Sequence, residues 1–235
     1  MLKLLVPRVR LFSTVVQAIN HVQEASLNEK CILVNEKDKA VGQASKRDCH
    51  MVGSLLLHRA FSVFLFNSKN ELLLQKRSST KVTFPDHITN TCCSHPLYDI
   101  NDERIEPGAL GVKLAAIRRL EFELGISQNL VAPEDLHYIT RILYKSIGDG
   151  NWGEHEIDYI LLIKKDLPVK PNPDEVSKVF YVPRDDFSDY MDKLKDPVTP
   201  WFKLVSNNGL KTWWDNIHRI DQYKDHVTIH RFDQH

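Results

Sequence analysis

Two adjacent cysteines, Cys92 and Cys93, stand in the stretch TNTCCSHPL at residues 89–97, directly before a serine and a histidine. In an extended backbone, neighbouring side chains point to opposite faces, so the two thiols cannot easily act together. A disulfide between neighbours is strained, which argues against a redox pair. We expect one thiol to be buried as a small hydrophobic group and the other to face a cleft. A cation near the cleft thiol would lower its pKa and suit it to act as a base or nucleophile.

Two carboxylates are spaced so that they could share a cation. Glu154 and Glu156 flank His155 in the stretch WGEHEIDY. Residues two apart in a strand share a face, so both glutamates point one way and His155 points the other way. Two like charges this close are costly unless a cation neutralises them, one is protonated, or the pair lies on an exposed edge. The apolar run IDYILLIK that follows places the pair at the mouth of a buried strand, which favours a functional site.

Three histidines, His50, His58 and His95, lie near predicted strands in other parts of the chain. Each histidine taken alone is most simply a surface or hydrogen-bonded residue. Together with Glu154 and Glu156 they would form a nitrogen and oxygen site that suits Mn²⁺ or Mg²⁺, or Zn²⁺ with expanded coordination. They come from distant segments, so spacing alone does not prove that they converge.

Basic side chains form a second candidate group. Arg binds phosphate through its planar fork and Lys binds it as a point charge, so a cluster of them could clamp a phosphate group. The alternative is that they are solvated surface residues. The candidates lie in three segments: Lys46 and Arg47, Arg77 and Lys81, and Arg118 and Arg119.

The composition excludes several classes of protein. The chain has 235 residues, is 42% hydrophobic and 26% charged, and has a formal net charge of zero. These values are typical of a soluble globular chain that can form a core of its own. We see no basic stripe of the kind that binds nucleic acid, and no apolar run near the roughly 18–20 residues of a membrane span. Four scattered cysteines without a Cys-x-x-Cys pair favour a reducing compartment.

Strand and helix patterns alternate along the chain and would have to position these groups. Aromatic and branched apolar runs predict strands, and apolar residues at helical spacing predict helices. Hairpins are predicted for 31–44 and 59–77, strands for 136–146, 156–165 and 176–186, and helices for 108–126, 185–195 and 199–220. This mixture predicts an α/β or α+β fold with a mixed sheet and helices on its faces. We divide the chain into an N-terminal extension, residues 1–25, and one unit, residues 26–235.

The N-terminal extension has the composition of a targeting segment. It carries Lys3, Arg8 and Arg10 but no acid before Glu24. Arg8 and Arg10 interrupt the continuous apolar stretch that a secretory signal requires, whereas a basic, acid-free and apolar segment suits a mitochondrial presequence. An ordinary frayed terminus is the alternative. We expect a mitochondrial location, or otherwise a cytosolic or peroxisomal one, although the C-terminal DQH is not a peroxisomal tripeptide of the Ser-Lys-Leu type.

Several uncommon motifs occur in an order that points to one family. They are LLHRAFSVFLFN, FP followed by TNTCCSHPL, RRLEFELGI, TRILYKS followed by GNWGEHEIDYILL, and TPWFK. Over residues 30–230 the sequence resembles the eukaryotic type I isopentenyl-diphosphate isomerases of the Nudix superfamily. The resemblance implies a Nudix fold, a mixed sheet sandwiched between helices. It also implies interconversion of isopentenyl and dimethylallyl diphosphate by a 1,3-allylic proton shift in isoprenoid biosynthesis.

The resemblance further implies roles for individual residues. It makes Glu156 the acid that protonates C4, with Tyr144 beside it, and Cys92 the cleft thiolate that removes a proton from C2, which leaves Cys93 as packing. Trp201 would stabilise the tertiary carbocation between the two steps. The implied metal ligands are His50, His58, His95, Glu154 and Glu156, the diphosphate contacts are Lys46, Arg77, Lys81, Ser94 and Arg119, and Glu123 would hold a second Mg²⁺ bound with the diphosphate. The partner would be a small diphosphate, with no nucleic acid or membrane, bound to a monomer or weak dimer.

One departure from the family concerns a turn. The family usually has Phe-Pro-Gly where this sequence has Phe84-Pro85-Asp86. Asp tolerates the left-handed backbone better than most residues, so we expect the turn to be kept. The substitution also places a negative charge near the implied diphosphate site.

Two other functions remain as alternatives. A Nudix hydrolase of a nucleoside diphosphate derivative needs the pattern Arg-Glu-x-x-Glu-Glu, but the stretch RRLEFELG has Arg119 and Phe122 at two of the glutamate positions. Several Mg²⁺ ligands of such a hydrolase are therefore missing. A non-catalytic metal- or phosphate-binding protein on the same fold is the second alternative, and the presence of both implied catalytic residues argues against it.

Overall fold

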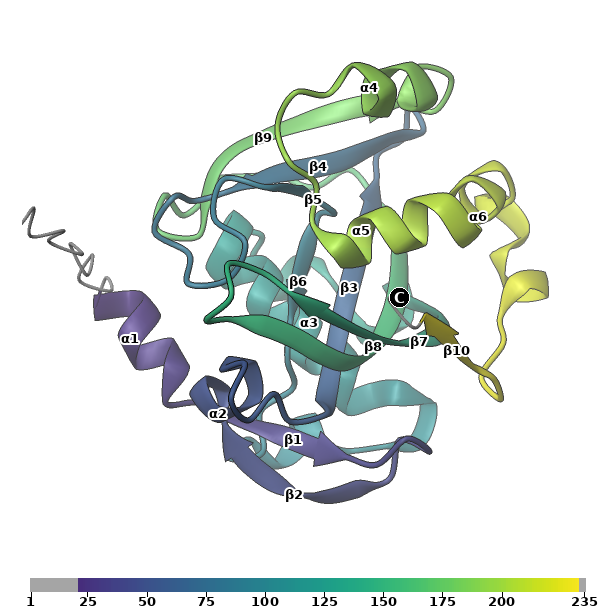
Figure 1. The fold of residues 1–235 in the computed structure, drawn as a ribbon. Coiled ribbons are helices and arrows are strands. Elements are labelled where there is room, and N and C mark those ends of the chain that lie inside the picture. Colours follow the sequence, from purple (N-terminus) through teal and green to yellow (C-terminus); the bar gives the residue numbers. More distant parts are fainter. Residues whose placement is uncertain (1–20, 233–235) are drawn as a thin grey trace, which may run out of the picture.

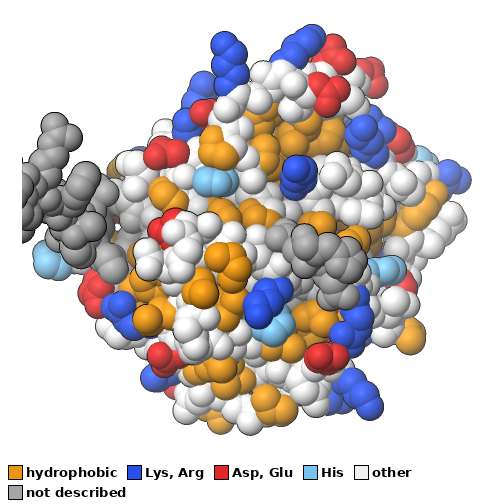
Figure 2. Space-filling model, viewed as in Figure 1, with side chains coloured by type: hydrophobic (Ala, Val, Ile, Leu, Met, Phe, Trp, Pro, Cys, Tyr) orange, Lys and Arg blue, Asp and Glu red, His pale blue; other side chains and the backbone are white. Residues whose placement is uncertain are grey.

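The computed structural model describes residues 21–232 (Figure 1). Most of the segment in which a presequence is expected, and the C-terminal DQH, lie outside the described residues. Within the described range, no helix is long and apolar enough to cross a membrane. On the face seen in Figure 2, basic and acidic side chains alternate over the surface, in keeping with the formal net charge of zero.

A mixed β-sheet runs through the middle of the molecule in the strand order β10-β7-β8-β3-β1-β2 (Figure 1). β3 and β8 are parallel, with the register His58↔Glu156 at one end and Phe66↔Lys164 at the other. All nine residues of β3 are buried, as expected for a strand that is covered on both faces. The strands of this order are β1 Lys30–Val34, β2 Ala40–Ser45, β3 His58–Phe66, β7 His137–Ile147, β8 Gly153–Lys164 and β10 Ile229–Phe232.

A second arm of strands branches from β3. β4 (Glu71–Arg77) pairs with β3 only at Phe66↔Leu72, directly after the turn, and then pairs with β9 (Val176–Pro183). The hairpin predicted for 59–77 is therefore present, but its two strands separate directly after the turn. Two short strands lie at this opening: β5 (Ile88–Thr89) pairs with β4, and β6 (Cys92–Ser94) pairs with β3.

Helices cover both faces of the sheet (Figure 1). α3 (Leu110–Leu124) packs on one face with Val63 and Leu65 of β3, while α5 (Pro200–Val205) and α6 (Lys211–Asp215) pack on the other. Alternate residues of β3 thus supply two separate cores. Gly125 ends α3 in a left-handed conformation, φ 63°, as a helix-terminating glycine does. The sheet between helices confirms the predicted fold class.

The N-terminal boundary needs a correction. α1 (His21–Leu27) spans the division that we predicted after residue 25. Gln23 is buried, and its side-chain amide donates to Glu175 Oε1 at 2.8 Å. Residues 21–25 therefore pack as part of the main body. The other helical segments are α2 Lys46–His50 and α4 Phe187–Lys193, a π-turn at Ser206–Leu210, and 3₁₀ turns at Asn101–Arg104, Pro107–Ala109, Gln128–Leu130, Pro133–Asp135 and Ile217–Tyr223.

Candidate active site

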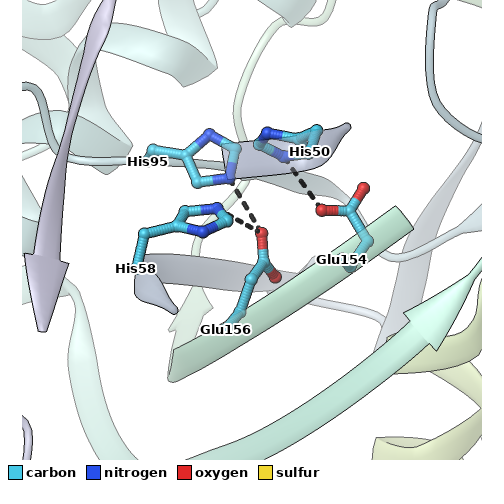
Figure 3. A group of neighbouring side chains, drawn as sticks. All are labelled: His50, His58, His95, Glu154 and Glu156. Carbon is cyan, nitrogen blue, oxygen red and sulfur yellow. Dashed lines mark hydrogen bonds and ion pairs between the residues drawn. The ribbon is translucent and has the colours of Figure 1, made fainter. Parts of the chain in front are cut away.

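Three histidines and two glutamates converge at one end of the parallel strand pair (Figure 3). One possible ligand atom from each of the five side chains lies within 4.8 Å of all the others, and all five residues are buried. His50 ends α2, His58 begins β3, and His95 follows β6, while Glu154 and Glu156 lie on β8. The structure thus brings together the five residues that the sequence left in distant segments.

Strand register explains this convergence. The parallel pairing places His58 directly beside Glu156, and β6 runs along the other side of β3, which carries His95 to the same end. Glu154 and Glu156 share one face of β8, as their spacing predicts. His155 points away, and its ring Nδ1 lies 3.1 Å from the backbone oxygen of Leu55.

The imidazoles lie against the carboxylates (Figure 3). His95 Nε2 is 2.8 Å from Glu156 Oε1, and His58 Nε2 is 3.4 Å from the same oxygen. His50 Nε2 approaches Glu154 Oε2 to 2.9 Å, without hydrogen-bond geometry. Within the described residues, His58 Nε2 and Glu154 Oε2 have no hydrogen-bond partner, although both are buried. Unpaired nitrogen and oxygen atoms directed at one centre fit a divalent cation held by imidazole and carboxylate ligands.

The pKa values of several groups in the cluster are strongly shifted when no cation is bound. Burial opposes protonation of His58, but the nearby carboxylate of Glu156 prevails and raises the pKa of His58 to about 9. Burial and the neighbouring His58 and His50 lower the pKa of His95 well below its usual value. Burial would raise the pKa of Glu156, but the same two histidines hold it below its ordinary value. At pH 7 the His58 imidazole is therefore protonated beside the ionised carboxylate of Glu156.

A cavity opens beside this cluster. Its walls combine basic side chains, aromatic rings and the histidine–glutamate group, so polar and apolar ends of one ligand could be held together. The lining residues are Gln23, Ser26, Leu27, Lys46, His50, Phe61, Ser62, Arg77, Lys81, Val82, Thr83, Cys93, Ser94, His95, Arg119, Tyr144, Glu154, Glu156 and Trp201. This set includes all five implied diphosphate contacts and both implied pocket aromatics.

The two cysteines are oriented opposite to our expectation. Cys92 is fully buried in the core under α3, whereas Cys93 lines the cavity. The cause is the register of β6: Cys92 pairs with Val63, which faces the same core, and Cys93 pairs with Ser62, which also lines the cavity. Paired residues in a sheet share a face. The prediction that Cys92 is the cleft thiol and Cys93 the packing residue is therefore corrected.

The thiol of Cys93 lies next to a guanidinium group. Arg77 Nη1 is 3.8 Å from its sulfur. Burial raises the pKa of Cys93 to about 12, although the charge of Arg77 acts in the opposite direction. Arg77 also donates to the backbone oxygens of Thr83 and Phe84 and lies 5.6 Å from the ring centroid of Trp201. Arg77 therefore lies in contact with the Cys93 thiol, with the loop at Thr83 and Phe84, and with the indole of Trp201.

Across the cavity, Tyr144 and Glu156 form a short hydrogen bond. The Tyr144 hydroxyl donates to Glu156 Oε2 at 2.5 Å, and burial together with the charge of Glu156 raises the pKa of Tyr144 well above its usual value. Asp158 lies two residues further on the same face of β8, and burial together with the charge of Glu156 raises its pKa well above the usual value. It accepts a hydrogen bond from Ser62 at 2.8 Å. Tyr144 therefore carries its proton and points it at the carboxylate.

Asn90 and Glu175 were missed by the sequence interpretation. Asn90 is fully buried; its amide donates to the backbone oxygens of Val63 and Cys92, and its carbonyl accepts from Trp201 Nε1 at 3.0 Å. Its position two residues before the first cysteine was the available signal. Glu175 bonds to two cations of the cavity wall and stands in the polar stretch PNPDEV, which gave no signal.

Two implied residues lie away from the cavity surface. Glu123 is buried behind Arg119, whose Nη2 donates to it at 2.7 Å, and it also accepts from Gln75 at 3.0 Å. Its role as a ligand of a second Mg²⁺ stays a prediction. Asp86 adopts the left-handed conformation expected for this turn, φ 60°, but it is exposed and does not line the cavity.

Comparisons with known proteins place the chain in a family. The NUDIX domain family matches residues 56–202. Isopentenyl-diphosphate Delta-isomerase 1 of Mesocricetus auratus is 47% identical over 91% of this chain and 96% of that protein. An isopentenyl-diphosphate delta-isomerase of Gibberella zeae is 49% identical over 87% of this chain and 83% of that protein. The chloroplastic isopentenyl-diphosphate Delta-isomerase II of Arabidopsis thaliana is 49% identical over 86% of this chain and 75% of that protein.

Solved structures agree at the level of the fold. A Deinococcus radiodurans protein superposes with a TM-score of 0.53 at 18% identity, over 76% of this chain and 98% of that chain. A NUDIX hydrolase from Alicyclobacillus acidocaldarius superposes with a TM-score of 0.52 at 9% identity, over 72% of this chain and 97% of that chain. Such low identities show a shared fold alone. Together with the closer sequence relatives, they show that this chain belongs to the NUDIX-domain family of isopentenyl-diphosphate Delta-isomerases.

Proposed function

We propose that this protein interconverts isopentenyl diphosphate and dimethylallyl diphosphate by an allylic proton shift. The observation that carries the proposal is a single cavity in which Cys93, Glu156 and Trp201 lie beside a basic wall. An unactivated alkene needs a proton donor at one end, a proton acceptor at the other and a surface that tolerates a carbocation between them. These three side chains supply those functions, and the relatives at 47–49% identity are named for this activity.

The basic wall is suited to the diphosphate end of the substrate. Lys46, Arg77, Lys81 and Arg119 line it together with Ser94. Guanidinium forks and a lysine ammonium group match the charge and the several acceptor oxygens of a diphosphate. Binding that end fixes the distance at which the hydrocarbon end reaches the other wall, so the basic wall also orients the alkene.

The histidine–glutamate cluster would hold a divalent cation. The donor set suits Mn²⁺ or Mg²⁺, or Zn²⁺ with expanded coordination, and Mg²⁺ also commonly accompanies a bound diphosphate. When bound, the cation supplies positive charge that neutralises the two adjacent carboxylates. His50, His58, His95, Glu154 and Glu156 would be its ligands.

Cys93 and Glu156 are the two groups that exchange protons with the substrate. Microscopic reversibility makes each of them a donor in one direction and an acceptor in the other. With Glu156 acting at C4 and the thiol at C2, formation of dimethylallyl diphosphate begins from carboxylic acid and thiolate. The reverse reaction begins from carboxylate and thiol. The raised pKa of Cys93 and the lowered pKa of Glu156 favour the second state in the ligand-free site.

Trp201 stabilises the carbocation intermediate, and Tyr144 orients the carboxyl group of Glu156. The indole is held by its hydrogen bond to Asn90 and by the edge of Phe84, whose ring centroid is 5.4 Å away. A tryptophan face stabilises a desolvated cation by about 2 kcal/mol. Tyr144 fixes one oxygen of Glu156 and therefore the direction in which the carboxyl group acts.

The decisive experiment follows hydrogen exchange in heavy water. Purified protein with Mg²⁺ and isopentenyl diphosphate should yield dimethylallyl diphosphate that contains deuterium. Cys93→Ala should abolish both isomerisation and exchange, and Cys92→Ala is its matched control because that thiol lies in the core. Product without deuterium, or loss of turnover in Cys92→Ala with near-normal turnover in Cys93→Ala, would overturn the proposal. Release of phosphate from nucleotide substrates would instead favour a hydrolase.

We also propose that the basic N-terminal segment that precedes α1 directs the chain to mitochondria. The basic, acid-free composition of the first 23 residues supports this proposal, and two Arabidopsis thaliana relatives are named chloroplastic, so organelle targeting occurs among the relatives. Residues 1–25 fused to a fluorescent reporter should accumulate in mitochondria. A reporter that stays diffuse in the cytosol contradicts the proposal, and Arg8→Glu combined with Arg10→Glu serves as the control.

A further inference from the structure

Glu175 is a buried carboxylate directly behind the basic wall of the cavity. Its side chain is 2% exposed, and it does not line the cavity itself. Oε2 accepts from Lys81 Nζ at 2.6 Å and from Arg119 Nη2 at 2.9 Å. Oε1 accepts from the amide of Gln23 at 2.8 Å. Both oxygens are therefore engaged by protein donors, and the two cations are drawn to the same atom.

The backbone around Glu175 links the elements that carry the two cations. Its carbonyl accepts from the amide of Ser78, at the start of the segment that leads to Lys81, at 2.9 Å. Arg119 comes from α3 on the other side. Glu175 itself directly precedes β9, and its amide donates to Asn172 at 3.0 Å. The carboxylate is thus held by a backbone position that is independent of both cations.

Glu175 provides negative charge next to the basic side chains of the cavity wall. Burial lowers the pKa of Lys81, and the nearby charges of Arg77 and Lys46 lower it further. The carboxylate of Glu175 raises the pKa of Lys81 and so opposes these effects. Burial opposes ionisation of Glu175, yet Lys81 and Arg119 hold its pKa far below the usual range. Arg119 has a second anionic partner in Glu123, whereas Glu175 is the carboxylate to which Lys81 is paired among the described residues. Removing Glu175 therefore affects Lys81 most.

We propose that Glu175 is a positioning residue for diphosphate recognition: it offsets the charges of Lys81 and Arg119 and directs both cations towards the same part of the cavity. This inference rests on the proposed function, since it takes the cavity to bind a diphosphate. Glu175 does not line the cavity, and it reaches the cavity wall through Lys81 and Arg119. Its loss should therefore weaken binding of the diphosphate end and leave the proton transfers largely intact.

The test uses Glu175→Gln, which keeps the shape and removes the charge. Binding of inorganic pyrophosphate, measured by calorimetry in Mg²⁺, should weaken at least tenfold, because hydrogen bonds to charged groups contribute substantially more than neutral ones. The KM for isopentenyl diphosphate should rise by a similar factor, while kcat should stay within about threefold of the wild type. Wild-type affinity for pyrophosphate, or a loss confined to kcat, would refute the inference.

Asp38 offers a matched control. It is also a buried carboxylate that bridges two cations, but these cations, Arg59 and Arg141, do not line the cavity. Asp38→Asn should lower thermal stability and leave pyrophosphate affinity unchanged. If Asp38→Asn weakened pyrophosphate binding as much as Glu175→Gln, the effect would be general loss of structure and the inference would fail.

A double variant separates positioning from a direct contact. If Glu175 acts chiefly through Lys81, then Glu175→Gln combined with Lys81→Met should bind pyrophosphate little worse than Lys81→Met alone, and fully additive losses would contradict the inference. If Glu175→Gln does not fold, Glu175→Asp keeps the charge but withdraws it by one methylene and carries the same expectation for pyrophosphate. Because pyrophosphate binding needs no turnover, weakened binding without any isomerisation would sink the proposed function and leave this inference standing.

Discussion

Cation binding at the histidine–glutamate cluster should release a proton and depend steeply on pH. In the cation-free protein the pKa of His58 is raised from 6.5 to about 9. Nε2 of this ring faces Glu156 and must lose its proton before a cation can bind there. His95 is already neutral and Glu156 already ionised at pH 7, because their pKa values are both lowered. His58 is therefore the group that gives up a proton.

The magnitude follows from the position of this pKa. Each pH unit below about 9 reduces the unprotonated fraction of His58 tenfold, so the apparent affinity at pH 7 should be about 100-fold below its plateau. The stability of the cation-free protein should respond with the opposite sign. A histidine whose pKa is raised by folding contributes stability below its unfolded pKa of about 6.5, and this contribution is lost as the pH rises through about 9.

The assay is calorimetry of Mn²⁺ binding to chelator-treated protein at pH 6.5, 7.5 and 8.5, in buffers with different ionisation enthalpies. We expect the affinity to rise about tenfold per pH unit and about one proton to be released per cation at pH 7.5. His155→Gln is the control, because His155 lies on the opposite face of β8 and should leave the slope unchanged. An affinity that is constant from pH 6.5 to 8.5, with no proton release, would refute this account of the cluster.

Three further predictions concern single side chains. Cys92→Ala should keep isomerase activity and lower the free energy of unfolding by about 1–2 kcal/mol, measured by denaturant titration, because it opens a small cavity under α3. Tyr144→Phe should lower kcat by about 10- to 100-fold in steady-state assays with little change in KM, since it removes a hydrogen bond to Glu156 but no contact with the basic wall. Asp86→Gly should leave KM within about twofold, because Asp86 is exposed and outside the cavity lining; a larger drop in KM would mean that its charge reaches the diphosphate.

Local patterns determined a large part of this protein from the sequence alone. The helix Leu110–Leu124 and its terminal Gly125, the β1–β2 hairpin, and the shared face of Glu154 and Glu156 all depend on neighbours a few residues apart. Such features follow from the helical and strand periods, which are properties of the backbone itself. The family motifs then identified the fold and the chemistry, because several uncommon residue patterns occur in the same order along the chain as in the family.

Only the tertiary structure decided which groups meet and which way they face. The sequence indicated that one of two adjacent thiols would face a cleft, but the choice of Cys93 comes from the pairing of β6 with β3, which no local pattern specifies. Glu175 joins Lys81 and Arg119 across 94 and 56 residues of chain. Contacts at such separations arise from the packing of whole elements, and a single side chain in a polar loop carries no trace of them. Register and packing, not residue type, therefore select the thiol that lines the cavity and the counter-charge of the basic wall.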